Sequence, residues 1–324
     1  MTTPHHVILD SLLGKEQYEA CRSTVEDMIK LQMEAAQPDD HELAHLHLFL
    51  CRALQGEHRH DQAGAKADIA EFLARKLKDW NLVREALYRA GFNYIQAGNY
   101  PTAVERFTAS LDYGDDQFKA KALFNRGHAH ERQLAFSFAA QDMEQAIQLV
   151  GDKEPSLLRD CRMNLAWHLI LLGEFERAEK ELNRLSAHGP EDRYTQLQMA
   201  HDRLHILHLK GEGREALLNA VTALRQAGTD YPDVKALVGL TLMSVSVEEG
   251  LVEQGFALGV LSKRLAGKAN RLDLDQAASR KMQALEFSAG ADCLAQSLLR
   301  SGQVAQGALS ARRTQKRVNI GGVN

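Results

Sequence analysis

Apolar residues recur at three- and four-residue spacing along most of the chain, which places them on one face of an α-helix. The segments 83–96 and 157–172 show this spacing clearly. A glycine lies at the end of each segment, at Gly98 and Gly173, and a second helical pattern begins directly after it. The pattern therefore predicts pairs of amphipathic helices joined by tight turns, and an all-α fold.

The glycine turns recur along the sequence. In 97–110, 172–185 and 210–224, an alanine follows the glycine by five residues. Equivalent turns fall at Gly14, Gly56, Gly98, Leu134, Gly173, Gly211, Gly250 and Gly302, at intervals of 36 to 52 residues. One helical hairpin cannot bury its own apolar face, but stacked copies can. The sequence therefore predicts an array of about eight antiparallel helix hairpins.

One stretch, 84–115, carries apolar, small and aromatic residues in a fixed order. The order is Leu87, Gly91, Tyr94, Tyr100, Ala103 and Phe107, and 120–151 repeat it in part with Leu123, Gly127, Ala139 and Ala146. In this order the chain resembles the tetratricopeptide repeat (TPR) family, whose repeats have about 34 residues, in its loose, long-repeat bacterial form. The resemblance implies a right-handed superhelical solenoid.

No shift in composition marks a domain boundary, so residues 1–309 are expected to form a single TPR-like array. The best-matching repeats span 84–225, those in 226–309 are irregular, and 310–324 are expected to end a last helix and fray. Gly91 is expected where paired helices approach most closely, whereas Gly64 is assigned to no such contact.

The resemblance also implies a binding surface. In tetratricopeptide arrays the first helix of each repeat lines a concave groove, and fixed positions face the ligand. Carried over to this sequence, the groove residues are Tyr88, Phe92, Ile95, Phe124, His128, Arg132, Met163, Trp167, Ile170, His201, His205 and His208. Such a mixed aromatic and polar face suits an extended peptide or a partner helix. The alternative is that the aromatic residues only pack against neighbouring repeats.

The segment HELAH, at 41–45, has the HExxH spacing of helical zinc proteases, with His41 and His45 one turn apart and Glu42 as the base. Asp39 and Glu42 also resemble a capping box, which makes the segment an ordinary helix start. His45 falls at a packing position of its repeat. We therefore expect no metal here, although His41 and His45 stay the candidates for one.

A second histidine group, His201, His205 and His208, lies on one helical face. Two of these imidazoles, those of His201 and His205, could bind a metal. The group could also form a groove that becomes cationic as the pH falls, or a solvated polar wall. The sequence favours the solvated wall and predicts no cofactor.

Composition excludes several classes of partner. The net charge of −4, with 14 histidines counted as neutral, is too small to predict direct binding to nucleic acid or to an anionic membrane. No apolar stretch approaches the roughly 18 residues of a membrane span. The four cysteines include no CxxC pair, which indicates buried thiols in a reducing compartment, so a cytoplasmic location is expected.

The sequence thus predicts a non-enzymatic scaffold that binds a protein or peptide ligand in a concave groove. The alternative is a peptide-sensing signalling or transcription-regulatory protein that acts through a partner chain. A third interpretation, a zinc-dependent hydrolase, depends on HELAH alone. The sequence indicates neither the identity of the partner nor the oligomeric state.

Overall fold

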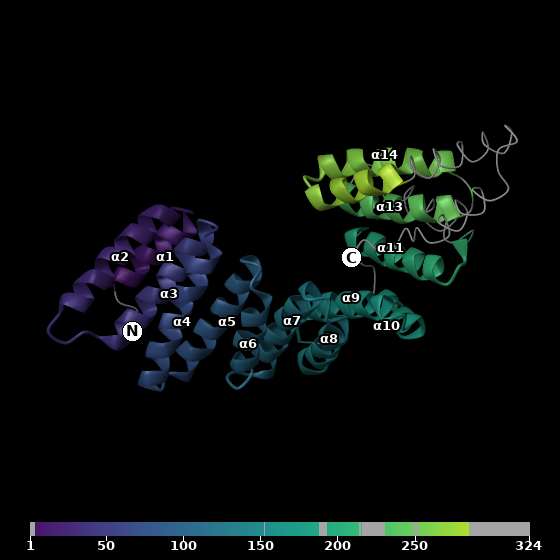
Figure 1. The fold of residues 1–324 in the computed structure, drawn as a ribbon. Helices are drawn as coiled ribbons and strands as arrows, with labels where there is room; N and C mark the ends of the chain where they lie inside the picture. Colours follow the sequence, from purple (N-terminus) through teal and green to yellow (C-terminus); the bar gives the residue numbers. More distant parts are fainter. Residues whose placement is uncertain are drawn as a thin grey trace, which may run out of the picture. The chain divides into compact units, whose positions relative to one another are not determined.

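The structure, a computed structural model, describes residues 4–151, 153–187, 193–213, 215, 231–248, 250 and 252–284. The helices are α1 (Pro4–Gly14), α2 (Tyr18–Glu34), α3 (Asp40–Gly56), α4 (His60–Leu77), α5 (Trp80–Gln96), α6 (Tyr100–Ser110), α7 (Asp116–Arg132), α8 (Phe136–Val150), α9 (Pro155–Leu171), α10 (Phe175–Ala187), α11 (Arg193–Leu209), α13 (Pro232–Glu248) and α14 (Val252–Lys268) (Figure 1). Residues 272–284 are also helical. These described residues contain no strand, and the all-α prediction is confirmed.

The chain divides into two compact units, Met1–Glu181 and Leu182–Asn324, with the boundary inside α10. We call them unit 1 and unit 2 and describe each by itself. The expected single array over 1–309 stays a prediction, and the expected tail, 310–324, lies outside the described residues.

Unit 1 is built from helical hairpins in sequence order. From α1 to α9 each helix contacts the next along the chain, and α3 also contacts α5, α5 contacts α7, and α7 contacts α9. No such contact joins α4 to α6 or α6 to α8 in this described part of the unit. The odd-numbered helices therefore approach one another more closely than the even-numbered ones. We call α3, α5, α7 and α9 the inner layer of unit 1.

The helices of one hairpin meet at small residues, as the sequence predicts. A Cβ atom added to Gly91 would lie 2.9 Å from the ring of Phe107, and Phe107 is fully buried. Ala103, one turn before Phe107, is fully buried as well. In the next hairpin a Cβ atom on Gly127 would lie 2.6 Å from the methyl carbon of Met143. Two successive hairpins thus use the same close approach.

The assignment of Gly64 is wrong. A Cβ atom on Gly64 would lie 2.9 Å from the ring of Tyr94, which belongs to the following hairpin. The Tyr94 hydroxyl donates a hydrogen bond to Asp68 Oδ2, at 2.7 Å. Tyr94 therefore packs on α4, and Gly64, the small residue that makes room for its ring, belongs to the preceding repeat.

Several hairpin turns lie where the glycines predict. The backbone has a positive φ at Gly98, Gly173, Gly211 and Gly250, between 77° and 80°. Leu134 adopts the same left-handed conformation, with φ 59°, although it is not a glycine. The predicted turn at Gly302 lies outside the described residues.

The first two turns lie two residues later than predicted. The residues with positive φ are Glu16 and His58, whereas Gly14 and Gly56 still belong to helices. Position 56 needs a glycine for packing and not for the turn, since an added Cβ atom would collide with the ring of Tyr18. In this repeat the glycine at the end of the first helix therefore makes room for a side chain of the preceding hairpin.

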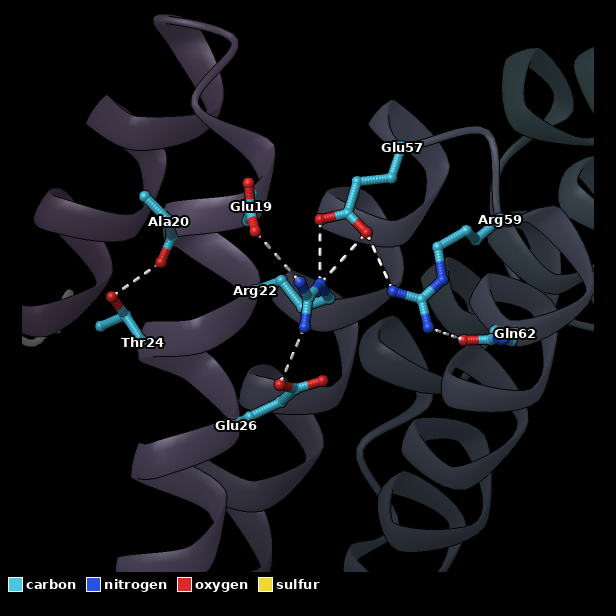
Figure 2. Close-up of polar contacts among 8 residues, drawn as sticks. All are labelled: Glu19, Ala20, Arg22, Thr24, Glu26, Glu57, Arg59 and Gln62. Carbon is cyan, nitrogen blue, oxygen red and sulfur yellow. Dashed lines mark hydrogen bonds and ion pairs between the residues drawn. The ribbon is translucent and has the colours of Figure 1, made fainter.

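Figure 2 shows the polar contacts that join the first two hairpins. Arg22 on α2 donates from Nε to both carboxylate oxygens of Glu57, at 2.9 and 3.1 Å. Arg59 donates to Glu57 Oε2 at 3.0 Å from the other side. Burial acts to raise the pKa of Glu57, but the hydrogen bonds from the two guanidinium groups outweigh it and lower that pKa.

Candidate functional site

Tyr88 links two helices of the inner layer. Its ring lies edge-on to Phe107, with centroids 5.7 Å apart, and against Phe118 at 5.5 Å. Its hydroxyl accepts a hydrogen bond from Asn125 Nδ2 on α7, at 3.0 Å. Burial raises the pKa of Tyr88, although the bond from Asn125 opposes the effect. The side chain is half-buried, so part of it still faces solvent.

Phe92 and Ile95 lie further along α5. Both side chains are half-buried and pack against the core cluster that contains Ala103 and Phe107. One side of each residue packs on the core, and the other is exposed to solvent. The assignment of both residues to a ligand-binding groove stays a prediction.

On α7, Phe124 and His128 form a perpendicular pair with ring centroids 4.5 Å apart. His128 Nδ1 lies 3.4 Å from Glu131 Oε2, and His168 Nε2 on α9 lies 3.5 Å from the same oxygen. Burial acts to raise the pKa of Glu131, but the two imidazoles outweigh it and lower the pKa to about 2.

The sequence analysis missed Glu131 and His168. Glu131 lies one helical turn after His128, and His168 is fully buried directly after Trp167. The three-residue spacing of His128 and Glu131 can be read from the sequence, but the contact between α7 and α9 cannot. These residues tie two helices of the inner layer together beneath the predicted groove.

The last predicted residues of unit 1 differ in exposure. Arg132 is exposed, and Met163 and Trp167 are half-buried. The prediction for Ile170 is wrong, since its side chain is only 1 % exposed. Ile170 lies four residues after the buried Ala166 and next to the buried Leu169, so it belongs to the core face of α9.

The HELAH segment begins α3. Asp39 Oδ1 accepts hydrogen bonds from the backbone N–H groups of His41, at 2.9 Å, and Glu42, at 3.2 Å, which confirms its capping role. Glu42 does not complete the capping box, because the Asp39 N–H donates to Gln32 Oε1 at 3.4 Å, whereas Glu42 Oε1 lies 3.3 Å from His6 Nε2.

The histidines of HELAH pack against each other. The rings of His41 and His45 lie 4.7 Å apart, and that of His6 lies 5.3 Å from His45. Burial, together with the neighbouring imidazoles, lowers the pKa of His45. In the parts of the chain that the structure describes, no group of three or more histidine, cysteine or acidic residues is arranged to hold a metal ion.

In unit 2 the histidines of α11 lie in a row. The rings of His201 and His205 stack at 6.1 Å, and those of His205 and His208 lie 6.2 Å apart. His201 is only 8 % exposed, and its nitrogens lie 3.1 Å from Asp202 Oδ1 and 3.4 Å from Thr241 Oγ1. The favoured prediction of a solvated wall is therefore wrong for His201.

Neighbouring helices add polar groups that the sequence analysis did not identify. His208 Nδ1 lies 3.4 Å from Glu248 Oε2 on α13. Lys281 Nζ, from the helix at 272–284, donates to Ser244 Oγ at 2.6 Å. Burial lowers the pKa of His205 to about 4, and the charges of the other histidines and Lys281 act in the same direction. The polar groups beside the histidine row thus come from two other helices, α13 and the helix at 272–284.

Cys21, Cys51 and Cys161 are free and buried, and burial raises the pKa of the Cys51 and Cys161 thiols to about 12. Cys293 lies outside the described residues. Over the described residues, the structure contains no helix with the length and apolar character needed to cross a membrane.

No family model matches the chain, and no curated protein is similar to it in sequence at the level searched. Solved structures are similar in fold. The apo form of the quorum sensor NprR from B. thuringiensis is 12% identical, with a TM-score of 0.59 over 94% of this chain and 95% of that one. The C-terminal part of a TPR repeat-containing protein from Cytophaga hutchinsonii has a TM-score of 0.56 and 12% identity, over 80% of this chain and 94% of its own.

A Rap protein complexed with competence and sporulation factor is 14% identical, with a TM-score of 0.53 over 96% of this chain and 94% of that one. NprR in complex with its cognate peptide NprX is 12% identical, with a TM-score of 0.52 over 99% of this chain and 91% of that one. These likenesses agree with the succession of helical hairpins along the chain. The chain has the fold of a tetratricopeptide-type helical repeat solenoid.

Proposed function

We propose that this chain is a non-enzymatic scaffold that binds a peptide, or an extended segment of a protein, on the inner layer of unit 1. The observation that carries the proposal is a set of half-buried aromatic side chains on successive inner helices. Phe92 lies on α5, Phe124 on α7 and Trp167 on α9. Aromatic residues are enriched at protein interfaces, and tryptophan and tyrosine are among the residues that most often dominate the binding energy.

Polar groups beside these rings would set the orientation of the ligand. Asn125 is held by its bond to Tyr88, and His128 by its contact with Glu131. Arg132 is exposed at the end of α7 and can pair with an acidic residue of the ligand. A few fixed polar groups among apolar ones are typical of peptide-binding surfaces.

The comparisons support this proposal and favour one version of it. Among the similar structures, NprR is described as a quorum sensor and was solved with its cognate peptide, and the Rap protein with competence and sporulation factor. The second candidate is therefore a peptide-sensing regulator that acts through a partner chain. We place the protein in the cytoplasm, because buried thiols fit a reducing compartment, and propose no cofactor and no direct contact with nucleic acid.

The test is a selection of random peptides displayed against the full chain, followed by affinity measurements with three variants. Phe92→Ala and Trp167→Ala should each weaken the selected peptides about thirtyfold, while circular dichroism stays unchanged. The matched control is Phe72→Ala, because Phe72 is 67 % exposed on α4, outside the inner layer. Peptides that bind the first two variants normally, or lose affinity only with Phe72→Ala, would overturn the proposal.

A further inference from the structure

Phe92, His128 and Trp167 occupy equivalent places on three helices of the inner layer. Each is the thirteenth residue of its helix, on α5, α7 and α9 respectively. All three side chains are half-buried. Because α7 contacts both α5 and α9, His128 comes between the two aromatic residues in a row across the inner layer. A ligand that contacts both rings therefore also covers the imidazole.

Glu131 fixes one nitrogen of this imidazole. His128 Nδ1 lies 3.4 Å from Glu131 Oε2, within hydrogen-bond distance. The Glu131 carboxylate is ionised at neutral pH, since its pKa is about 2, and an ionised carboxylate only accepts hydrogen bonds. The proton of the neutral His128 imidazole therefore lies on Nδ1, which donates to Glu131.

His168 holds Glu131 in this position. Its Nε2 lies 3.5 Å from the same carboxylate oxygen, and its side chain is fully buried on α9. The imidazoles of two helices thus share Glu131 Oε2. A rotation of Glu131 away from His128 would also break its contact with His168, so the His128 ring keeps one orientation.

The second nitrogen of His128, Nε2, is left as a hydrogen-bond acceptor, because a neutral imidazole carries one proton only. Among the residues that the structure describes, none lies within hydrogen-bond distance of this nitrogen, and the ring's partners are Glu131 and Phe124. The side chain is 33 % exposed, so water can donate to Nε2 in the free protein. A ligand that covers the row removes this water, and an acceptor that is then left unpaired weakens binding.

We propose that His128 determines the specificity of the peptide-binding surface, by accepting at Nε2 a hydrogen bond from an N–H or O–H group of the ligand. Glu131 is the positioning residue that keeps the imidazole in the accepting form. The inference rests on the proposed function and names the chemistry that the ligand places between the groups held by Phe92 and Trp167. A ligand with a carbonyl or carboxylate oxygen at this place would meet the lone pair of Nε2, and an apolar group would leave Nε2 unpaired.

The first measurement needs no ligand and uses the full chain with ¹⁵N-labelled histidine at pH 8. Long-range ¹⁵N–¹H correlation spectra distinguish a protonated ring nitrogen from a bare one, and the signals that His128→Gln removes identify His128. This residue should be protonated at Nδ1 and bare at Nε2. Glu131→Ala should shift it toward the Nε2–H form that free histidine favours, whereas Glu105→Ala, at an exposed position on α6, should leave it unchanged. A proton on Nε2 of His128 in the wild type would overturn the inference.

The second measurement uses a peptide that is selected by display against the full chain and that loses affinity with Phe92→Ala and Trp167→Ala. Each main-chain N–H group of this peptide is methylated in turn, and each side-chain donor is replaced by an apolar group of similar size. One of these changes should weaken binding to the wild type about tenfold or more, because it leaves Nε2 unpaired. Methylation with this effect identifies a main-chain donor, and a side-chain replacement identifies a side-chain donor.

His128→Phe completes a double-mutant cycle with the same peptides. It removes the acceptor but keeps a ring, so the critical change in the peptide should have little further effect on affinity. His128→Gln, whose amide oxygen can accept in place of Nε2, should keep part of the discrimination. His5→Phe, at an exposed position on α1, is the matched control and should discriminate as the wild type does.

Equal losses of affinity in the wild type and in His128→Phe, for every change in the peptide, would overturn the inference. Because such a peptide still depends on Phe92 and Trp167, that result would leave the proposed function intact. If no selected peptide depends on Phe92 and Trp167, the proposed function fails and the specificity role of His128 fails with it.

Discussion

Arg126 on α7 and Asp142 on α8 form a buried ion pair inside one hairpin. The guanidinium Nε and Nη2 lie 3.0 and 2.5 Å from the carboxylate oxygens, and Asp142 is only 3 % exposed. The next hairpin has the same relationship, with Arg162 Nη1 2.7 Å from Glu181 Oε2. The two helices of these hairpins are thus joined by a charge pair as well as by apolar packing.

Asp142→Ala should therefore destabilise the protein, because it leaves the Arg126 guanidinium without its buried partner. We expect a loss of about 3–5 kcal/mol in the free energy of unfolding, measured with urea at pH 7. The double variant Arg126→Met/Asp142→Leu should recover most of this loss, since apolar groups of similar volume replace the pair. A single variant as stable as the wild type would show that the pair is not formed in solution.

Leu134 has a left-handed backbone, with φ 59°, and its side chain is 57 % exposed. That conformation costs a residue with a side chain roughly 1–2 kcal/mol, and glycine avoids the cost. Leu134→Gly should therefore raise the midpoint of thermal unfolding. Leu172→Gly is the matched control and should lower it, because Leu172 ends α9 with an ordinary φ of −85°. Midpoints of thermal unfolding that change in the same direction in both variants would contradict this account of the turns.

Gly64→Ala tests the contact between hairpins. The added methyl group would lie 2.9 Å from the ring of Tyr94, so that ring must move, at a cost of roughly 1–3 kcal/mol. At Gly14, a helical position with nothing within 4 Å, the same change should stabilise the helix by up to about 1 kcal/mol. Urea unfolding of both variants measures the difference, and equal tolerance would mean that Tyr94 does not pack on α4.

Burial lowers the pKa of His47 to about 4, and the charge of Lys66 adds to the effect. An imidazole in the unfolded chain has a pKa near 6.5, so below that pH the unfolded state binds a proton more readily. This contribution to stability is complete above pH 6.5 and is lost as the pH falls toward 4.

Between pH 7 and pH 5, the wild type should therefore lose roughly 1–2 kcal/mol more stability than His47→Gln. Urea unfolding at the two pH values measures the free energy of unfolding of each variant. His5→Gln, at an exposed position, should follow the wild type. If His47→Gln loses as much stability as the wild type, then His47 is not buried as a neutral imidazole.

The sequence predicts contacts within a hairpin better than contacts between hairpins. Gly91, Ala103 and Phe107 are near one another in sequence and follow a known repeat order, so their packing could be read directly. The Gly64–Tyr94 contact joins two repeats, and no single repeat shows it. The same limit applies to Glu131 and His168, which meet only because α7 lies beside α9.

The candidate site was predicted from positions in a repeat, and the errors follow from that. Ile170 occupies a groove position by alignment, but its apolar neighbours Ala166 and Leu169 place it on the core side of α9. Lys281 lies in a C-terminal region where the repeat pattern is weakest, so alignment assigned it no role.

The most direct measurement of peptide binding on the inner layer is the fluorescence of Trp167. The sequence has two tryptophans, and Trp80→Phe leaves Trp167 as the only one. Trp80 is stacked on Tyr113 at the start of α5, with ring centroids 5.7 Å apart, so phenylalanine can replace it there. A selected peptide that binds this variant should shift the Trp167 emission to shorter wavelength, with the same dissociation constant as an independent binding assay. Full binding of the peptide with no change in Trp167 emission would contradict the account.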